Sequence, residues 1–235
     1  MGVWVCLPTY NERENLERMV RALGNAIEPA HDRVLVIDDS SPDGTGELAD
    51  RLAVELGYVE VLHRERKEGL GPAYLAGFRR ALAAGADLVV EIDCDFSHDP
   101  ASVPRLVAAC ADADLALGSR YVPGGAIENW GVVRRAVSAG GSLYARLLLG
   151  IPVHDLTGGF KCFRREVLER IELDTITARG YAFQIETTYR AIRSGFRVVE
   201  VPIRFADRTR GGSKMSRRIV LEAVWRVPVM RLRRW

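Results

Sequence analysis

The chain has 235 residues, enough for one α/β domain of ordinary size but tight for two. Hydrophobic residues make up 48% and charged residues 27%, at a net charge of +2, which is typical of a globular protein and excludes a disordered or collagen-like chain. No apolar run reaches the roughly 18 residues of a membrane-spanning helix, and residues 1–30 lack the layout of a signal peptide. The four cysteines form no C-x-x-C pair, so we expect buried thiols in a reducing compartment and a soluble or peripheral, cytoplasmic protein.

Five short apolar runs in the first half of the chain predict buried parallel strands. They cover Val3–Leu7, Arg33–Ile37, Val59–Leu62, Leu88–Ile92 and Leu115–Leu117. Segments with helical periodicity separate them, and this alternation implies right-handed crossovers. We therefore predict an α/β fold with a mostly parallel, doubly wound sheet.

Two of the separating segments carry the apolar stripe of an amphipathic helix. Leu16, Met19, Val20 and Leu23 follow the i, i+3, i+4, i+7 spacing, with Asn11 as the expected N-cap. The second stripe comprises Leu70, Tyr74, Gly77, Phe78 and Ala81. No internal repeat or low-complexity linker is present, so we expect one domain over residues 1–212 with residues 213–235 as an appended tail.

Polar clusters follow three of the predicted strands. They are Pro8-Thr9-Tyr10-Asn11-Glu12, Asp38–Thr45 and Asp93–His98. Ligands of a doubly wound sheet bind outside the carboxyl ends of its strands, so we expect these clusters to share one rim. Helix caps and turns would explain any one cluster but not readily all three.

The pair Asp93 and Asp95 is the most specific indication of a functional site in the sequence. They stand two residues apart at a strand end, so an extended backbone points both to the same side and Cys94 away. Two carboxylates so placed repel each other, and the usual remedy is a divalent cation with oxygen ligands, which favours Mg²⁺ or Mn²⁺. Ser97 continues the two-residue step, and His98 is a weaker candidate ligand. The alternative is an ordinary surface turn.

Asp38 and Asp39 close the second predicted strand. A carboxylate there can accept hydrogen bonds from a ribose or a base edge. The G-x-G-x-x-G turn of dinucleotide-binding folds does not follow the first strand, where the chain reads Leu7-Pro8-Thr9-Tyr10-Asn11. This argues against nicotinamide or flavin binding, and Gly44-Thr45-Gly46 is expected to be a turn and helix start.

Isolated basic residues in turn-like contexts are candidates to contact phosphates. They are Arg120, Arg134, Arg135, Arg208 and Lys214. Glycines close to a lysine, as at Gly211-Gly212-Ser213-Lys214, let the backbone approach a phosphate closely. The spacing is not that of a Walker A motif, and each arginine taken singly is compatible with an ordinary surface residue.

The C-terminal segment is strongly basic. Residues 204–235 carry ten Lys/Arg against two acids, giving +8, whereas the rest of the chain, with 23 basic and 29 acidic side chains, carries −6. The tail ends in Arg-Leu-Arg-Arg-Trp, which is typical of an interfacial membrane anchor, and Pro228 is expected to kink or end its helix. The alternatives are a helix that packs back on the domain and a solvated helix end. The polar wedge expected for this helix comprises Arg218, Glu222, Arg226 and Arg233.

Five motifs occur in order along the chain. They are Leu-Pro-Thr-Tyr-Asn-Glu (7–12), Val-Ile-Asp-Asp-Ser-Ser-Pro-Asp-Gly-Thr (36–45), Ile-Asp-Cys-Asp-Phe-Ser-His-Asp-Pro (92–100), Gly-Ser-Arg-Tyr (118–121) and Gly-Gly-Ser-Lys (211–214). Together they resemble the dolichol-phosphate (polyprenol-phosphate) mannose synthases of glycosyltransferase family two, from residue 3 to about residue 216. Each motif alone is shared with many family-two transferases, whereas the ordered set is much more specific.

The resemblance implies a GT-A fold that binds GDP-mannose with Mg²⁺ or Mn²⁺. Asp95 and Ser97 would hold the metal, and Asp95, Arg120 and Lys214 would be the catalytic residues. The sequence departs from the family at Cys94, where alanine is common, and at Ser97, where some members have glutamine. The implied contacts with the nucleotide sugar are Pro8, Tyr10, Glu12, Ile37, Asp39, Asp93, Cys94, Asp95, Arg120, Arg208 and Lys214.

The reaction that the resemblance implies is inverting transfer of mannose to a polyprenyl monophosphate in the membrane. This acceptor is already an anion at pH 7, so a dedicated general base is dispensable. We expect the protein to work at the cytoplasmic face, without nucleic acid, and to reach the lipid through its tail or a separate membrane-anchoring protein. Two alternatives stay open: transfer of glucose from UDP-glucose to the same lipid, and a catalytically silent membrane-surface module, which would not need the Asp93–Asp95 pair.

Overall fold

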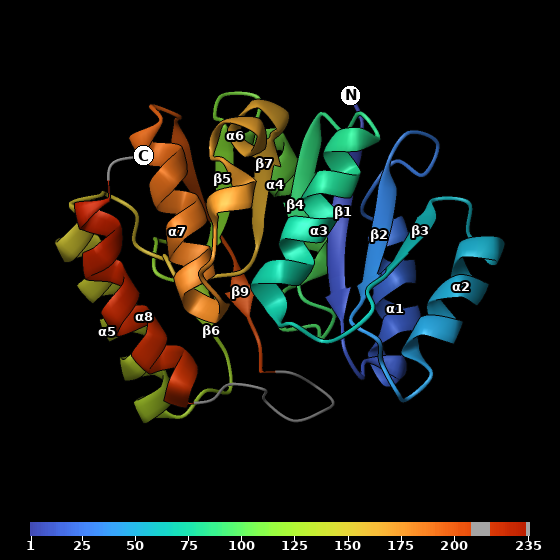
Figure 1. The fold of residues 1–235 in the computed structure, drawn as a ribbon, viewed down its shortest axis with the longest axis horizontal. Coiled ribbons are helices and arrows are strands. Elements are labelled where there is room, and N and C mark those ends of the chain that lie inside the picture. The colour runs from blue at the N-terminus through green and yellow to red at the C-terminus, as the bar shows by residue number, and fades with distance from the viewer. Residues whose placement is uncertain (208–216, 234–235) are drawn as a thin grey trace.

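The computed structural model describes residues 1–207 and 217–233, in which a seven-stranded sheet lies between two layers of helices (Figure 1). The strand order is β3-β2-β1-β4-β7-β5-β8, and β6 and β9 form a separate small sheet. The strands are β1 (Val3–Thr9), β2 (Arg33–Asp38), β3 (Val59–His63), β4 (Leu88–Glu91), β5 (Leu115–Ser119), β6 (Ala126–Ile127), β7 (Lys161–Arg164), β8 (Val198–Pro202) and β9 (Arg204–Phe205). The α-helices are α1 (Arg13–Gly24), α2 (Thr45–Glu55), α3 (Leu70–Ala83), α4 (Val103–Ala109), α5 (Val132–Leu149), α6 (Arg165–Arg170), α7 (Gly180–Arg193) and α8 (Arg217–Leu232).

The predicted α/β architecture is confirmed, with one strand that runs against the others. All five predicted strand runs form strands, β1 to β5. β7 enters between β4 and β5 and is antiparallel to both, so β4 and β5 still run in the same direction. The carboxyl ends of β1, β2, β4 and β5 therefore meet at one edge of the sheet.

Side chains along the strands alternate between two cores, one on each face of the sheet. In β1, Val5 and Leu7 face the core beneath α1, α2 and α4, whereas Trp4 and Cys6 face the core beneath α3, α6 and α7. The four stripe residues predicted for α1 are fully buried in the first of these cores. The predicted helix start at Gly44-Thr45-Gly46 is also confirmed, because Gly44 is the N-cap of α2.

The loops after β1 and β2 are tied together at the start of α1. The N-cap of this helix is Glu12, so the expected cap at Asn11 is wrong. Asn11 has a φ of 55°, a left-handed conformation that asparagine adopts more readily than most residues. The backbone N–H groups of Asn11 and Glu12 donate to the hydroxyls of Ser41 and Thr45, each at 3.0 Å. These bonds fix the path of both loops at the edge of the sheet.

The helix of the C-terminal tail, α8, packs on the domain beside α5 and α7 (Figure 1). Val227 and Met230 are buried in the core, and the Tyr144 hydroxyl donates to the Val224 carbonyl at 2.9 Å. Pro228 lies inside the helix and does not end it. Of the alternatives left open for the tail, this helix therefore packs back on the domain. Within the described part of the chain, no helix is long and apolar enough to cross a membrane.

A buried ion pair joins β4 and β7. The antiparallel register sets Glu91 opposite Lys161, with their charged atoms 3.2 Å apart and both side chains fully buried. Lys161 Nζ also donates to the Gln184 carbonyl of α7 at 2.9 Å and to Thr187 Oγ1 at 3.2 Å. Burial raises the pKa of Glu91 and lowers that of Lys161, while the charge of each partner favours the ionised form of the other. Removal of one partner would leave the other charge buried without compensation.

We predict that Lys161→Met lowers the free energy of unfolding by about 3–5 kcal/mol, because Glu91 would remain buried without its counter-charge. The double variant Glu91→Leu/Lys161→Met should recover much of this loss, since it buries no charge. Arg80→Met is the matched control, because Arg80 pairs with Glu60 at 2.7 Å on the surface and its loss should cost less than about 1 kcal/mol. Urea denaturation measures all three, and a Lys161→Met protein as stable as Arg80→Met would contradict the prediction.

Candidate active site

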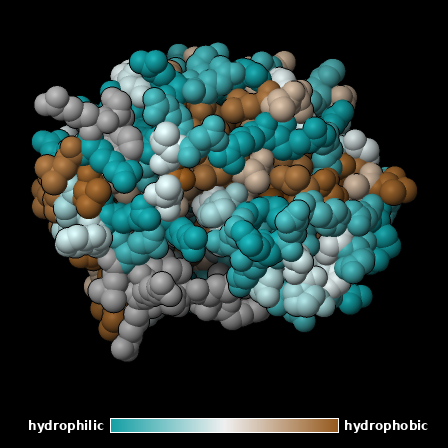
Figure 2. All heavy atoms as spheres, viewed as in Figure 1, coloured by the Kyte–Doolittle hydropathy of each residue, from teal (hydrophilic) through white to brown (hydrophobic). Residues whose placement is uncertain are grey.

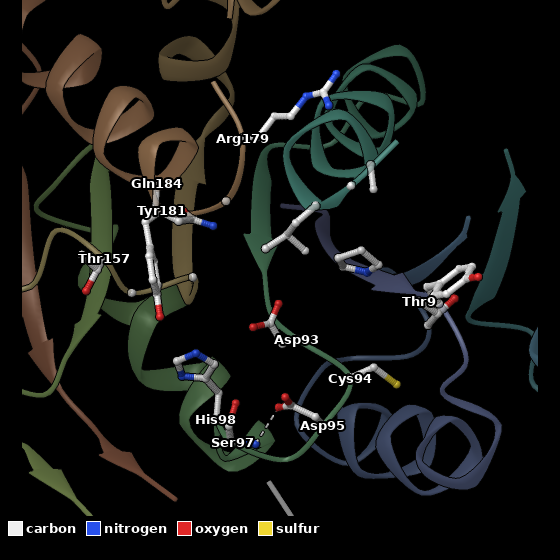
Figure 3. A pocket seen from close by; sticks show the side chains of 18 of the residues that line it. Thr9, Asp93, Cys94, Asp95, Ser97, His98, Thr157, Arg179, Tyr181 and Gln184 are labelled. Atoms are coloured by element: carbon white, nitrogen blue, oxygen red, sulfur yellow. Dashed lines mark hydrogen bonds between the residues drawn. The ribbon is translucent and has the colours of Figure 1, made fainter. Parts of the chain in front are cut away.

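The polar segments after β1, β2 and β4 line one cleft of about 1050 Å³ at the carboxyl edge of the sheet (Figure 3). The expectation that these three clusters share a rim is therefore confirmed. Most of the predicted site residues line this cleft: Pro8, Tyr10, Glu12, Asp39, Asp93, Cys94, Asp95, Ser97 and Arg120.

Four predicted residues are not placed at the cleft. Ile37 is fully buried in the core beneath α3, because the alternation along β2 turns its side chain to that face. Arg135 is absent from the cleft lining and donates through Nη2 to the Ile127 carbonyl at 3.0 Å. Arg208 and Lys214 lie outside the described residues, so their phosphate contacts stay predictions.

One end of the cleft is built by the loops after β1 and β2. Asp39 lines it, whereas Asp38 builds the turn, accepting hydrogen bonds from the Ser41 backbone N–H at 3.1 Å and from its hydroxyl at 2.6 Å. The Asp39 carboxylate is nearly buried and forms an ion pair with Arg64. The structure therefore assigns different roles to these two neighbouring carboxylates.

An aromatic ring and a cation complete the same end. Lys67 Nζ lies 3.6 Å from the centre of the Tyr10 ring, and both residues line the cleft. Lys67 and Arg64 were not predicted as site residues, because nothing in the charged run 64–68 marks which side chains face inward. This end offers a flat ring, a carboxylate and cations, a set that can bind an aromatic base and a ribose.

Asp93 and Asp95 lie in a loop rather than in the predicted strand. β4 ends at Glu91, and Phe96 has a φ of 60°, so the chain turns sharply after the carboxylates. Figure 3 shows both carboxylates on one side of this loop and Cys94 on the other, where its side chain joins the core. The predicted orientation is confirmed, but a turn produces it and not strand alternation.

The oxygen atoms of this loop fit a hard divalent cation. Asp95 Oδ1 accepts from the Ser97 backbone N–H at 3.0 Å, and Asp93 Oδ1 accepts from the Tyr74 hydroxyl at 3.2 Å, which orients both carboxylates. Among residues 1–207 and 217–233, no three His, Cys, Asp or Glu side chains gather to form a metal cage. Mg²⁺ commonly binds through one or two carboxylates and takes its other ligands from water and substrate phosphates. The residues present fit that mode of binding.

A buried arginine lies in the cleft wall after β5. Arg120 donates through Nε and Nη2 to the two oxygens of Asp155 at 2.7 and 2.6 Å, and through Nη2 to Thr157 Oγ1 at 3.0 Å. Burial opposes the charged form, but the hydrogen bonds and charge of Asp155 raise the pKa of Arg120 overall. The result is a fixed positive charge at the cleft. The sequence motif named Arg120 but not its partner, which lies 35 residues away.

A histidine that lines the cleft has aromatic surroundings. The His98 ring centre lies 5.1 Å from that of Phe160 and 4.8 Å from that of Phe205. Burial first, and then the charge of Arg120, lower the pKa of His98 to about 4. His98 is therefore neutral at pH 7 and packs as an aromatic residue.

The opposite wall comes from segments that the sequence did not predict to lie at the site. Glu222 and Arg226 of α8, expected in a polar wedge, pair with each other at 3.1 Å, and Glu222 accepts from the Arg179 backbone N–H at 3.3 Å. The tail thus closes one side of the cleft instead of turning these charges to solvent. The residues of this wall include Gly158, Gly159, Arg179, Gly180, Tyr181, Gln184, Glu222, Trp225 and Arg226.

Known proteins of similar sequence match most of the chain. Residues 4–172 match the model of glycosyl transferase family 2. The chain is 51% identical over 225 residues to the polyprenol monophosphomannose synthase of Mycolicibacterium smegmatis, across 95% of this chain and 84% of that protein. It is 50% identical over 224 residues to the undecaprenyl-phosphate mannosyltransferase of Micrococcus luteus, across 95% of this chain and 91% of that protein.

A solved structure shares the fold. The glucosyl-3-phosphoglycerate synthase of Mycobacterium tuberculosis, crystallised with Mn²⁺, UDP and phosphoglyceric acid, superposes with a TM-score of 0.69. The two sequences are 23% identical, and the match covers 96% of this chain and 78% of the other. At this identity the likeness concerns the fold alone. The chain therefore belongs to glycosyl transferase family 2, and it is a glycosyltransferase with the GT-A fold rather than a catalytically silent module.

Proposed function

We propose that this enzyme transfers mannose from GDP-mannose to a polyprenyl monophosphate, with inversion at the anomeric carbon. The observation that carries the proposal is its identity of 51% and 50% to two mannosyl-transferring proteins whose names specify polyprenol and undecaprenyl phosphate. The cleft supports it, because carboxylates, a buried arginine and a base-binding end meet in one place.

The two ends of GDP-mannose would bind to different loops. Tyr10 and Asp39, with Pro8 and Glu12 beside them, would hold the guanosine. Asp93 and Cys94 would line the nucleotide sugar. Asp95 and Ser97 would hold Mg²⁺ or Mn²⁺, and a cation bound there supplies positive charge to the diphosphate.

Stabilisation of negative charge is the chemistry that this cleft favours. A nucleoside diphosphate leaves, and Arg120, together with Arg208 and Lys214, would stabilise the charge that develops on it. The lipid phosphate attacks as an anion, so no side chain has to remove a proton first. The environment of His98 agrees with this scheme, because its pKa of about 4 and its aromatic neighbours do not suit a general base.

In a screen of radiolabelled sugar nucleotides with a short polyprenyl phosphate, we expect GDP-mannose to be the substrate. Asp95→Ala should lower the rate of transfer at least about a thousandfold without unfolding the protein, because several kcal/mol of charge stabilisation are lost. Asp99→Ala is the matched control: Asp99 follows in the same loop, but it is exposed and accepts a hydrogen bond from the Ala101 N–H at 3.0 Å. Its rate should stay close to that of the wild type.

Two results of this experiment would overturn parts of the proposal. Transfer from UDP-glucose in place of GDP-mannose would make the enzyme a polyprenyl-phosphate glucosyltransferase. Near wild-type turnover of Asp95→Ala in the presence of EDTA would exclude the metal site at Asp95 and Ser97.

An exposed apolar surface on α5 and α8 supports work at a membrane. The two helices lie side by side at one end of the sheet, and Figure 2 shows apolar side chains gathered at that edge of the molecule. Such a surface on a water-soluble domain marks a binding face. Its residues are Val132, Val133, Val137, Leu143 and Leu147 of α5 and Val224, Trp225, Val229 and Leu232 of α8, which together we call the α5–α8 surface.

Charge and position make an anionic bilayer the proposed occupant of the α5–α8 surface. The sequence of α5 holds three arginines and no acidic residue, and that of α8 holds four arginines and one glutamate. Arginines beside apolar and aromatic side chains suit anionic headgroups. Trp225 belongs to this surface and also lines the cleft, so docking would bring the cleft to the lipid phosphate. The four free, buried cysteines support the cytoplasmic face.

We predict that Leu143→Ser/Leu147→Ser lowers binding to anionic liposomes at least about tenfold, because two exposed apolar side chains no longer enter the headgroup region. Activity on a short, water-soluble acceptor should be retained. Val54→Ser on α2 is the matched control, since Val54 is 91% exposed but lies outside this surface, and its sedimentation with liposomes should be unchanged. Equal sedimentation of both variants would contradict membrane docking through α5. If the wild-type protein did not sediment with liposomes of pure lipid, the result would instead indicate a separate membrane-anchoring protein.

A further inference from the structure

Gln184 is a buried polar side chain whose amide nitrogen has no hydrogen-bond partner among the described residues. It stands in the second turn of α7, its side chain is 2% exposed, and it lines the cleft. A buried N–H group without a partner costs free energy, so such groups are rare in native proteins. The Glu91 carboxylate attracts this NH₂ group, which favours the ionised form of Glu91, but without a hydrogen bond of ordinary geometry. An amide NH₂ carries two N–H donors. A donor that remains without an acceptor in the wall of a ligand cleft indicates that the ligand supplies one.

The orientation of this amide is fixed by Lys161. Gln184 Oε1 accepts a hydrogen bond from Lys161 Nζ, and the same ammonium holds the Gln184 carbonyl at 2.9 Å. If the amide were flipped, its NH₂ group would face the ammonium, and donor would oppose donor. Gln184 Nε2 must therefore point away from Lys161. Figure 3 shows the amide nitrogen directed into the cleft.

The space in front of this nitrogen exists because residue 159 is a glycine. A Cβ atom at Gly159 would lie 3.1 Å from Gln184 Nε2 and 3.9 Å from Asp93 Oδ2. A donor and an acceptor thus border the same small volume. A hydroxyl group, which both donates and accepts, matches this pair, whereas a phosphate would be repelled by the Asp93 carboxylate.

We propose that Gln184 Nε2 donates a hydrogen bond to a hydroxyl group of the transferred sugar, beside the Asp93 carboxylate, and that Gly159 keeps the space for that hydroxyl open. The inference rests on the proposed function in one respect, that the donor substrate is a sugar nucleotide. The base-binding end, with Tyr10 and Asp39, is built from other loops. Gln184 therefore distinguishes sugars and not bases.

Two variants distinguish a role of the amide nitrogen from an indirect effect through Lys161, which holds the amide in place. Gln184→Glu keeps an oxygen for Lys161 and replaces the donating NH₂ by an acceptor. Thr187→Val is the matched control, because Thr187 also accepts from Lys161 Nζ, at 3.2 Å, but does not line the cleft. An effect that acts only through Lys161 would appear in both variants. Gly159→Ala tests the space in front of the amide.

The experiment measures by calorimetry the affinity of each variant for a sugar nucleotide and for the corresponding nucleoside diphosphate. For Gln184→Glu and Gly159→Ala we expect the diphosphate affinity to stay within about twofold and the sugar-nucleotide affinity to fall roughly tenfold, the effect of one lost hydrogen bond. Thr187→Val should bind both molecules as the wild type does. Monodeoxy sugar nucleotides identify the hydroxyl: removal of the right one should weaken binding to the wild type roughly tenfold and leave binding to Gln184→Glu unchanged.

The outcomes distinguish this inference from the proposed function. Absence of GDP-mannose binding to the wild type would overturn the proposed donor, and the comparison is then made with the sugar nucleotide that does bind. An equal loss of affinity for sugar nucleotide and diphosphate in Gln184→Glu, or the same loss in Thr187→Val, would overturn the role of Gln184. So would a deoxy series in which every analogue behaves alike with the wild type and with Gln184→Glu, because the amide would then bind only water.

Discussion

The ion pair between Glu91 and Lys161 is the constraint on which the geometry of the cleft depends. It joins β4 to the one antiparallel strand of the main sheet, and Lys161 then binds the carbonyl and side chain of Gln184 in α7. The loop that carries Asp93 begins directly after Glu91. The two walls of the cleft, this loop and α7, are therefore both held by the same buried ion pair. A buried ion pair is weak as a source of net stability compared with apolar packing, but it penalises every arrangement that separates its charges. We interpret it as the element that keeps the two walls in register.

Two arginines that line the cleft are each paired with an aspartate in the substrate-free enzyme. Arg120 is fixed by both oxygens of Asp155, and Arg134 donates to Asp207 at 2.8 Å while it lies over the Trp130 ring. Such pairs reduce the cost of burying a cation in the empty enzyme. They also hold the positive charge in place. In the proposed reaction, little reorganisation would then be needed as negative charge develops on the leaving diphosphate.

Most of the sheet and about half of the residues that line the cleft could be predicted from the sequence. The physical reasons differ between the strands and the cleft residues. Apolar runs predict strands because burial on both faces of a sheet demands them. Polar clusters after such runs predict the edge of the sheet where ligands bind, and Asp39, Asp93 and Asp95 do line the cleft there. Lys161 and Asp155 could not be found in this way. Their roles depend on partners across the sheet or in a distant loop, and β7 has charged residues at both ends instead of an apolar run. The direction of a single side chain within a correctly predicted strand was also not predicted. Ile37 was expected to contact the nucleotide, but its side chain is buried in the core.

The C-terminal helix shows why an amphipathic pattern alone does not tell which face meets solvent. Glu222 and Arg226 formed the expected polar wedge, yet they turn toward the cleft, where the Arg179 backbone N–H and Thr177 Oγ1 bind them. The apolar residues that remain, with Trp225 and Leu232 foremost, face outward because α5 and α7 cover only part of the helix. The α5–α8 surface therefore lies at one end of the sheet, whereas the loops after β1 and β2, proposed to bind the base, lie in the other half (Figure 1). In the proposed function, a lipid phosphate in a membrane and a nucleotide sugar from solution would enter the cleft from different sides and meet at the loop of Asp93 and Asp95 between them.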